Sequence, residues 1–267
     1  MPASISATVF LAALFDLVLA FALPIGLALL LCRRHKGALR AVLMGAFCFI
    51  VGARVLEQLM HAVVFTLFPT LPQNIVLYVL YGALAAGVFE ETARLIGLRY
   101  LCRKDAAPAI GFAYGIGHGG IEAILLLGLG MVNQLIVITT VNSGNAASLL
   151  VGLNDTQQAT MTAQLNALAQ TPATTVLAGG WERVTAVALH IALSVLVWMV
   201  VAKRIGMWGY PLAIGLHALV DIAPVLYQTG ILRGIWLLEL ILTVFVAAIV
   251  ALVVRIYRKN VPDKIWE

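Results

Sequence analysis

The residues of this sequence that could carry chemistry lie inside long apolar runs. The stretch GVFEETARLIG, residues 87–97, holds two adjacent glutamates and an arginine. A charge at the centre of a bilayer costs at least ~2.5–3.5 kcal/mol on insertion scales, so charges inside a membrane usually mark a functional site or an internal ion pair. Three later apolar runs contain further ionisable residues, namely His118 and Glu122, then Glu182, Arg183 and His190, then His217 and Asp221.

The glutamates and the first histidine could activate water to hydrolyse a peptide bond. A positioned carboxylate or imidazole can act as the general base. Arg94 lies one helical turn after Glu90 and Glu91 and can keep one of them ionised. The other glutamate can then orient a water molecule, and His118 can share its proton.

The later residues could serve the oxyanion that forms during hydrolysis. His217 and Asp221 are four residues apart, so they share one face of a helix and could present donors to a tetrahedral oxyanion. His190 could support these groups or contact the substrate carbonyl.

The composition is that of a membrane protein. The chain has 267 residues, of which 62% are hydrophobic and 11% are charged, whereas soluble domains carry about 25% charged residues. The net charge of +5 is therefore not a sign of nucleic-acid binding, and the placement of the basic residues among the loops indicates the membrane topology. We expect an all-α, polytopic membrane helix bundle with the lipid bilayer as its surroundings and no nucleic-acid partner.

Seven apolar runs of at least ~20 residues are long enough to cross the bilayer. They span residues 6–31, 40–68, 75–101, 108–140, 173–202, 206–228 and 233–256. We expect one integral membrane domain, residues 1–267, with a catalytic core at about 75–228. The first run lacks a preceding basic segment and is too long for a signal peptide, so it is read as a retained span.

Basic residues gather at alternate connections and predict the orientation. Thirteen of the seventeen follow the odd-numbered spans, and Arg233 alone lies in a connection on the opposite side. Because cytoplasmic loops are enriched in Lys and Arg, the N-terminus is predicted outside and the C-terminus in the cytosol of a multi-pass protein of the bacterial cell (inner) membrane. The thirteen are Arg33, Arg34, Lys36, Arg40, Arg99, Arg103, Lys104, Lys203, Arg204, Arg255, Arg258, Lys259 and Lys264.

The ionisable groups of spans three to six fall at one predicted depth. At 1.5 Å per residue they lie roughly 12–20 Å from the cytosolic ends, although the spans alternate in direction. This pattern predicts one buried polar site. Small residues let helix backbones approach closely, and the glycines around His118 are Gly111, Gly115, Gly117, Gly119 and Gly120.

The outer segment 141–172 is too polar to span and has no Lys or Arg. A helix-start pattern at its centre predicts an amphipathic helix on the outer face. This helix could tie two spans together or act as a lid over a cavity. The residues that carry the prediction are Asn154, Asp155, Gln157 and Gln158, followed by Met161, Leu165 and Leu168.

The remaining polar residues favour structural roles. Cys32, Cys48 and Cys102 lack metal-ligand spacing and are expected as free thiols. Asp16 and Glu239 could each pair with a neighbouring span, and Glu182 with Arg183 is read as structural. One face of span two carries Arg54, Glu57 and His61, which could form an internal ion pair or line a substrate path.

Three short motifs together resemble a known superfamily. Glu90-Glu91-x-x-Arg94, Tyr114-x-x-x-His118 and His217-x-x-x-Asp221 are similar to the glutamic-type intramembrane proteases, which include the type II CAAX prenyl proteases and PrsW-like proteins. The pattern GIGHGGIEAI, with a further histidine in the next span, resembles the YhfC branch most closely. The resemblance covers about residues 85–225.

The resemblance implies an intramembrane endopeptidase acting on a membrane-embedded or membrane-associated protein or peptide. It implies that Glu90 is the water-activating base assisted by His118, that Glu91 and Arg94 form a structural pair, and that His217 and Asp221 form the oxyanion site. Supporting positions would be Tyr114, Glu122 and His190. It also implies no disulfide, no cofactor and no obligatory metal.

The sequence departs from the superfamily pattern in two places. Two residues rather than three separate the glutamate pair from Arg94, and Asp221 stands where the prenyl proteases have asparagine. An ionised carboxylate cannot donate a hydrogen bond. An alternative role for Asp221 is to orient His217 instead of binding the oxyanion.

Three other functions stay open from the sequence. A metal-dependent membrane hydrolase could use His118, Glu122, His190 and His217 as ligands, although there is no HExxH motif. A transporter or proton relay would also bury glutamates and histidines. A catalytically silent scaffold, like the non-catalytic γ-secretase subunit of the anterior-pharynx-defective type, is the third.

Overall fold

A computed structural model describes residue 2 and residues 4–101 and 107–261. This part of the chain is helical with turns and contains no strand, which confirms the all-α prediction. Seven helices are long and apolar enough to cross a membrane, in the predicted order. They span Ala7–Cys32, Ala38–Leu67, Ile75–Tyr100, Pro108–Asn142, Ala173–Val201, Gly209–Gln228 and Ile235–Asn260. The predictions for Cys102, Arg103, Lys104 and Lys264 fall outside the described residues.

The first four spans contain the irregular helices. Span one is α1 (Ala7–Cys32). Span two comprises α2 (Ala38–Phe49), a π-helical segment (Ile50–Glu57) and α3 (Gln58–Leu67). After a short 3₁₀ turn (Leu71–Gln73), span three is α4 (Ile75–Ile96) with a π-helical end (Gly97–Leu101). Span four comprises α5 (Pro108–Ala123), a π-helical segment (Ile124–Gly128) and α6 (Leu129–Asn142).

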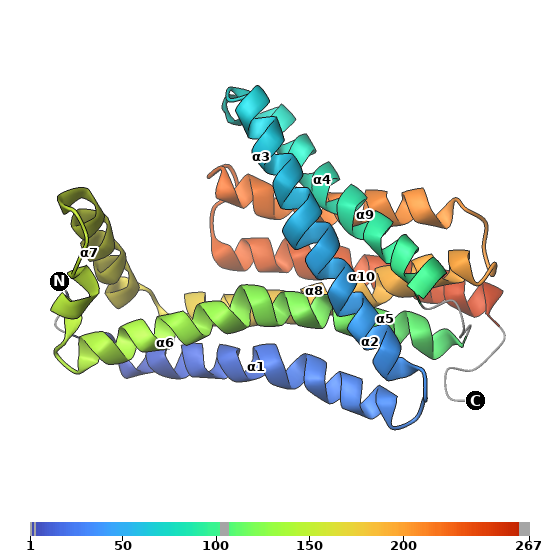
Figure 1. Ribbon diagram of the computed structural model, residues 1–267, viewed down its shortest axis with the longest axis horizontal. Helices are drawn as coiled ribbons and strands as arrows, with labels where there is room; N and C mark the ends of the chain where they lie inside the picture. Colours follow the sequence, from blue (N-terminus) through green and yellow to red (C-terminus); the bar gives the residue numbers. More distant parts are fainter. Residues whose placement is uncertain (1, 3, 102–106, 262–267) are drawn as a thin grey trace.

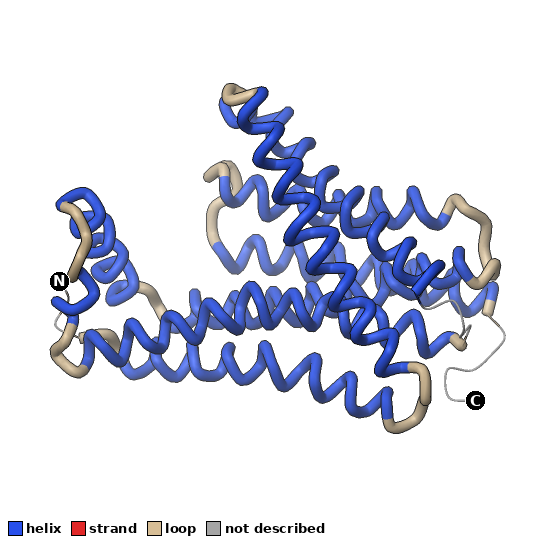
Figure 2. Tube along the Cα trace, viewed as in Figure 1, coloured by secondary structure: helices blue, strands red, loops and turns tan. Residues whose placement is uncertain are grey.

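The second half of the chain is more regular. A 3₁₀ turn (Ala146–Leu150) leads to α7 (Asp155–Gln170). Spans five, six and seven are α8 (Ala173–Val201), α9 (Gly209–Gln228) and α10 (Ile235–Asn260). Short turns join these helices (Figure 2). Where they are described, Cys32 and Cys48 are free thiols, as predicted.

Helix α8 is the centre of the bundle. In its most apolar stretch, 72% of the residues are buried inside the bundle, whereas the corresponding share in the other spans is 22–33%. It packs against α5, α10, α1 and α9. Helix α4 packs against α9, and the end of the α3–α4 pair at its short connecting turn projects beyond the other spans (Figure 1). This arrangement surrounds α8 with the helices that carry the other ionisable groups.

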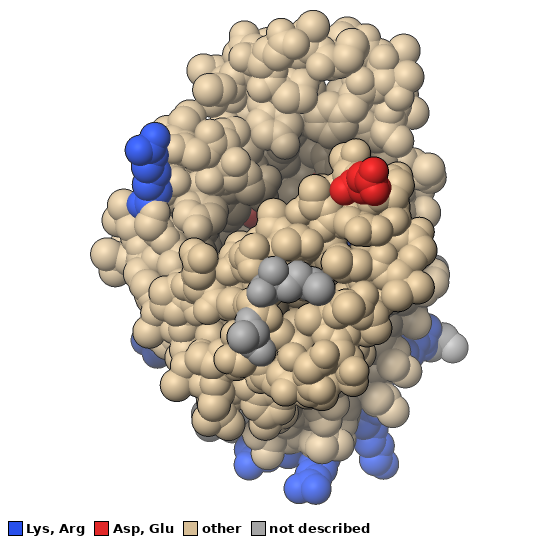
Figure 3. Space-filling model, turned by 90° about the vertical axis from the view of Figure 1, so that its left-hand side faces the viewer, with Lys and Arg blue, Asp and Glu red and all other residues tan. Residues whose placement is uncertain are grey.

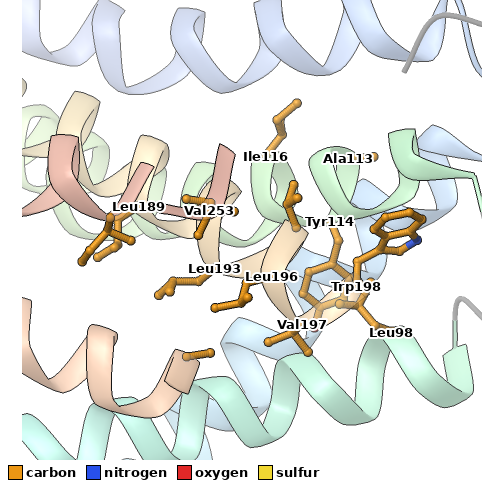
Figure 4. Packing of buried hydrophobic residues seen from close by; sticks show 14 of the residues in the cluster. Leu98, Ala113, Tyr114, Ile116, Leu189, Leu193, Leu196, Val197, Trp198 and Val253 are labelled. Atoms are coloured by element: carbon orange, nitrogen blue, oxygen red, sulfur yellow. The ribbon is translucent and has the colours of Figure 1, made fainter. Parts of the chain in front are cut away.

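The apolar core lies where α8 meets α5, α10 and the end of span three. Leu193, Leu196 and Trp198 of α8 pack with Tyr114 of α5 and Leu98 of span three (Figure 4). Lipid tails are as apolar as these side chains, so close van der Waals packing, rather than escape from water, stabilises such contacts.

Glycines allow α5 to lie almost in backbone contact with its neighbours. A Cβ atom at Gly117 would lie 1.9 Å from the carbonyl oxygen of Val42, and one at Gly115 would lie 2.5 Å from Cα of Ile191. No side chain fits at those distances. The predicted close approach around His118 is therefore present, and it holds α5 between α2 and α8.

Helix α7 is the predicted amphipathic helix of the outer segment. The Asn154 side chain accepts from the Gln157 backbone and the Gln157 side chain accepts from the Asn154 backbone, which forms a capping box. Leu165 is buried against Val9 of α1 and Ile138 of α6. These contacts favour the role of tying two spans together over that of a lid.

The basic ends of the odd-numbered spans gather at one end of the molecule. The C-terminal ends of α1, α4, α8 and α10 lie opposite α7 (Figure 1). This grouping matches the alternation of Lys and Arg along the sequence. Which end faces the cytosol stays a prediction.

Candidate active site

Three histidine ring nitrogens surround one carboxylate oxygen of Glu90. Nε2 of His118 is hydrogen-bonded to Oε2 of Glu90 at 2.8 Å. Nε2 of His217 lies 3.9 Å from the same oxygen and Nδ1 of His190 lies 4.0 Å from it. The four residues come from α4, α5, α8 and α9. The argument from depth along the spans thus led to residues that are neighbours in space, although their catalytic roles stay predictions.

This cluster is buried within the bundle. His118 is completely buried, and Glu90, His190 and His217 are at most 8% exposed. The rings of His118 and His190 lie with centroids 4.6 Å apart. Interactions between charges are stronger in such a site than in water because the local dielectric constant is low.

Arg94 lies behind the cluster and has two partners. Its Nη2 lies 3.4 Å from Oε1 of Glu91, and both side chains are completely buried, so the predicted ion pair is present. Nη2 also lies 3.0 Å from Nδ1 of His190, and Nη1 donates to the His190 carbonyl at 3.2 Å. Arg94 therefore joins α4 to α8 as well as neutralising Glu91.

His217 is oriented by Glu91. Its Nδ1–H donates to Oε1 of Glu91 at 2.7 Å. Its Nε2 lies 3.5 Å from Oδ2 of Asp221, and these two atoms form no hydrogen bond. The ring is thus held by a hydrogen bond to Glu91 of α4 and by none to the aspartate one turn along α9.

His190 is supported by Glu122. Its Nε2 lies 2.5 Å from Oε2 of Glu122. Oε1 of Glu122 accepts from Nη1 of Arg183 at 2.7 Å, and Nη2 of Arg183 pairs with Glu182. Arg183 therefore has the structural role predicted for it, because it fixes the carboxylate that contacts His190.

Tyr114 contributes to packing near the cluster rather than to the cluster itself. Its ring centroid lies 6.4 Å from that of His118, and its hydroxyl donates to the Ala93 carbonyl at 3.4 Å. The tyrosine is completely buried. In the YxxxH motif, the histidine reaches Glu90 and the tyrosine joins α5 to the backbone of α4.

A cavity of about 450 Å³ adjoins the cluster. Glu90, His190, His217 and Asp221 form part of its wall. The end of the molecule that carries α7 is hollowed, and acidic atoms are visible within the hollow (Figure 3). The Glu90 carboxylate therefore lies at the wall of an open space within the spans.

A second polar group lines the cavity from span two. His61 Nε2 lies 3.2 Å from Glu57 Oε1, and His61 Nδ1 lies 2.6 Å from the Tyr81 hydroxyl. The internal pair predicted from the sequence is present between Glu57 and His61. Both residues also line the cavity, and their part in a substrate path stays a prediction. Arg54 is exposed on the same helix. Nothing in the local sequence distinguished Tyr81 from an ordinary membrane tyrosine.

Comparison with known proteins assigns the chain to a family. The family profile described as YhfC intramembrane metalloprotease matches residues 19–242. The uncharacterized membrane protein YhfC of Bacillus subtilis (strain 168) is 36% identical over 243 residues, which cover 90% of this chain and 93% of the relative. This chain belongs to the YhfC family. No solved structure matches it.

The match confirms the resemblance to the YhfC branch that the sequence motifs indicated. It leaves the wider glutamic-type superfamily unconfirmed, because the family description reads metalloprotease. The absence of an obligatory metal was an implication of the superfamily, so it is equally unconfirmed.

The site suits a divalent metal ion by ligand type and spacing. One ligand atom each from Glu90, His118 and His190 lie within 4.8 Å of one another, and all three residues are buried. Carboxylate and imidazole are zinc ligands, and a metal-binding histidine usually contacts a carboxylate through its other nitrogen. Glu122 makes such a contact with His190.

The charge balance of the cavity also favours a bound cation. Its wall contains five carboxylates and one arginine, namely Glu57, Glu90, Glu122, Glu182, Asp221 and Arg183. Buried charges without a partner are costly, above all within a membrane. A cation at Glu90 would offset part of this excess. Arg94 Nη2, 3.0 Å from His190 Nδ1, would compete with the cation for that nitrogen.

Proposed function

We propose that this chain is an intramembrane peptidase that hydrolyses a peptide bond of a membrane-embedded or membrane-associated protein. The observation that carries the proposal is the convergence of His118, His190 and His217 on Glu90 beside a cavity within the spans. Such a constellation has the groups needed to activate water and to stabilise an oxyanion. The family description supports the same activity.

The first candidate mechanism uses a divalent metal ion held by Glu90, His118 and His190. A bound ion of this kind supplies Lewis acidity, which polarises the scissile carbonyl and makes water a stronger acid. Glu122 orients His190 so that its Nδ1 faces Glu90. Arg183 in turn fixes Glu122 through the bond to Oε1.

Asp221 is our candidate for the group that accepts the proton of water. Its Oδ2 has no hydrogen-bond partner in the described part of the chain, and the residue lines the cavity. An ionised carboxylate with a free oxygen beside the substrate can act as a general base. This role gives the aspartate a function that the asparagine of the prenyl proteases could not perform.

His217 is our candidate for oxyanion stabilisation. Its Nδ1–H is committed to Glu91, so Nε2 is the atom presented to the cavity. A protonated imidazole carries N–H groups at both nitrogens. In that state Nε2–H can donate to the oxyanion as charge develops on it.

The second candidate mechanism needs no metal. The direct 2.8 Å hydrogen bond between Glu90 and His118 favours it, as does the Arg94 contact with His190 Nδ1. Here Glu90 takes the proton of water and His118 shares it. Both mechanisms require Glu90, and they differ in their dependence on a divalent ion.

The proposed function is tested by comparing protein N-termini in membranes of cells that make the wild type or Glu90→Gln. New termini present only with the wild type are expected, and they would also identify substrates. Equal sets of termini from two well-expressed proteins would overturn the proposal in favour of a transporter or scaffold.

A further inference from the structure

A second cavity lies at the end of the molecule opposite α7. It has a volume of about 300 Å³ and forms where the end of span three meets the turn between α8 and α9. Arg99 and Lys203 are its charged lining residues. Most of the remaining lining is apolar and includes Leu95, Val200 and Ile205. The cavity lies apart from the Glu90 cluster and shares none of its residues.

The two cations at this cavity have no carboxylate partner in the described part of the chain. The Arg99 guanidinium lies 5.6 Å from the ring centroid of Tyr100, and neither Arg99 nor Lys203 forms an ion pair with a described residue. No Asp or Glu of the described ranges contributes to the lining. One positive charge from the end of span three and one from the α8–α9 turn thus flank an apolar cavity, an arrangement that is complementary to an anion with an apolar portion.

The backbone at Lys203 has a left-handed conformation. Lys203 has φ of 56°, and no other non-glycine residue in the described ranges has a positive φ. It follows the C-cap Ala202 of α8, where glycine is the preferred residue because it has no Cβ. A lysine in this left-handed conformation accepts strain that glycine would avoid, and it places an ammonium group at the cavity.

We propose that this cavity binds the phosphate group of an anionic phospholipid. Arg99 and Lys203 would contact the phosphate, and the glycerol and upper acyl chain would lie against the apolar lining. Tyr100 and Trp208 are 62% and 52% exposed beside the turn, as expected of aromatic residues at headgroup level. Basic pockets between spans on the predicted cytosolic side suit anionic headgroups. The apolar lining favours a lipid over free phosphate.

The test is a titration of the purified full-length protein in neutral detergent. Phosphatidylglycerol, phosphatidylcholine and inorganic phosphate are added separately, and thermal unfolding and Trp fluorescence are recorded. The variants are Lys203→Gly and the double variant Arg99→Gln/Lys203→Gly. Arg255→Gln/Arg258→Gln is the matched control, because it removes two exposed cations from the last turns of α10 at the same end.

Phosphatidylglycerol is expected to stabilise the wild type and the control in a saturable manner, whereas phosphatidylcholine and phosphate are not. Affinity should fall roughly five-fold for each cation removed. Without lipid, Lys203→Gly should be at least as stable as the wild type because the backbone strain is relieved. If the double variant does not fold, the phosphatidylglycerol affinity of Lys203→Gly alone tests the proposal. Unchanged phosphatidylglycerol affinity in the variants, or equal effects of phosphate or phosphatidylcholine, would overturn the proposal.

Discussion

Glu91 and His217 are joined by a 2.7 Å hydrogen bond that links α4 to α9 at the centre of the bundle. The same carboxylate oxygen lies 3.4 Å from Arg94. The second glutamate of the EExxR motif therefore connects the motif's own arginine to the histidine of the HxxxD motif. Glu90, in contrast, contacts His118 and faces the cavity. The two adjacent glutamates have different surroundings, which predicts different roles.

Replacing Glu91 should damage the fold more than replacing Glu90. Glu91→Gln leaves the buried Arg94 charge without its carboxylate, and breaking a buried pair costs roughly 3–5 kcal/mol. Glu90→Gln keeps a hydrogen-bonding group next to His118 and should unfold close to the wild type. Thermal and denaturant unfolding in the same detergent measure both. Equal stability of the two variants would contradict a structural role for Glu91 that Glu90 does not share.

The close approach of α5 to α2 predicts a strong effect at Gly117. In Gly117→Ala the new Cβ would lie 1.9 Å from the backbone oxygen of Val42, so the helices must separate and displace His118. We expect a loss of roughly 1–3 kcal/mol or more, as for other overpacked sites, and loss of activity.

Gly130→Ala in α6 is the matched control for Gly117→Ala. Nothing lies within 4 Å of a Cβ at Gly130, and alanine favours a helix by up to ~1 kcal/mol over glycine. It should be neutral or stabilising. Similar unfolding midpoints for the two variants would show that α5 and α2 are not in the close contact described.

The role of Asp221 can be separated from that of an oxyanion donor by Asp221→Asn. If Asp221 accepts the proton of water, the substitution should lower the cleavage rate about 10²–10⁴-fold while leaving stability nearly unchanged. If the position only orients His217 or donates to the oxyanion, asparagine should support cleavage, as the resemblance to the prenyl proteases implies. A retained rate would therefore remove Asp221 as the base.

Metal analysis distinguishes the two candidate mechanisms. The first predicts that the protein purified without chelator retains a divalent metal, and that chelation abolishes cleavage until zinc is restored. Glu122→Gln should weaken metal retention roughly 10–100-fold, because the carboxylate supports a ligand histidine. Full activity after exhaustive chelation, checked by elemental analysis, would favour activation by Glu90 and His118 alone.

The spans and the clustering of the candidate site residues could be predicted because each depends on one local property. Crossing a bilayer needs about 20 apolar residues, so the seven runs stand out. The shared depth of Glu90, His118, His190 and His217 follows from rise per residue and alternating direction. The capping residues Asn154 and Gln157 similarly predicted α7.

The partners within the site could not be predicted, because they depend on how each helix is rotated about its axis. His217 contacts Glu91 on another helix rather than relying on Asp221 four residues away. Glu122 reaches His190 only because α5 and α8 pack closely. Hydropathy did not mark α8 as the central helix, because α1 is equally apolar and lipid is as apolar as a protein core.

The most direct test uses purified protein in liposomes with a substrate found in the comparison of N-termini. Wild type, Glu90→Gln and Glu239→Gln are compared in H₂¹⁸O; Glu239 is a buried carboxylate of α10 that does not line the site cavity. We predict one cleaved bond with ¹⁸O in the new carboxyl terminus for the wild type and Glu239→Gln, and a rate at least ~100-fold lower for Glu90→Gln. Equal cleavage by Glu90→Gln, or none by the folded wild type, would contradict a hydrolytic site centred on Glu90.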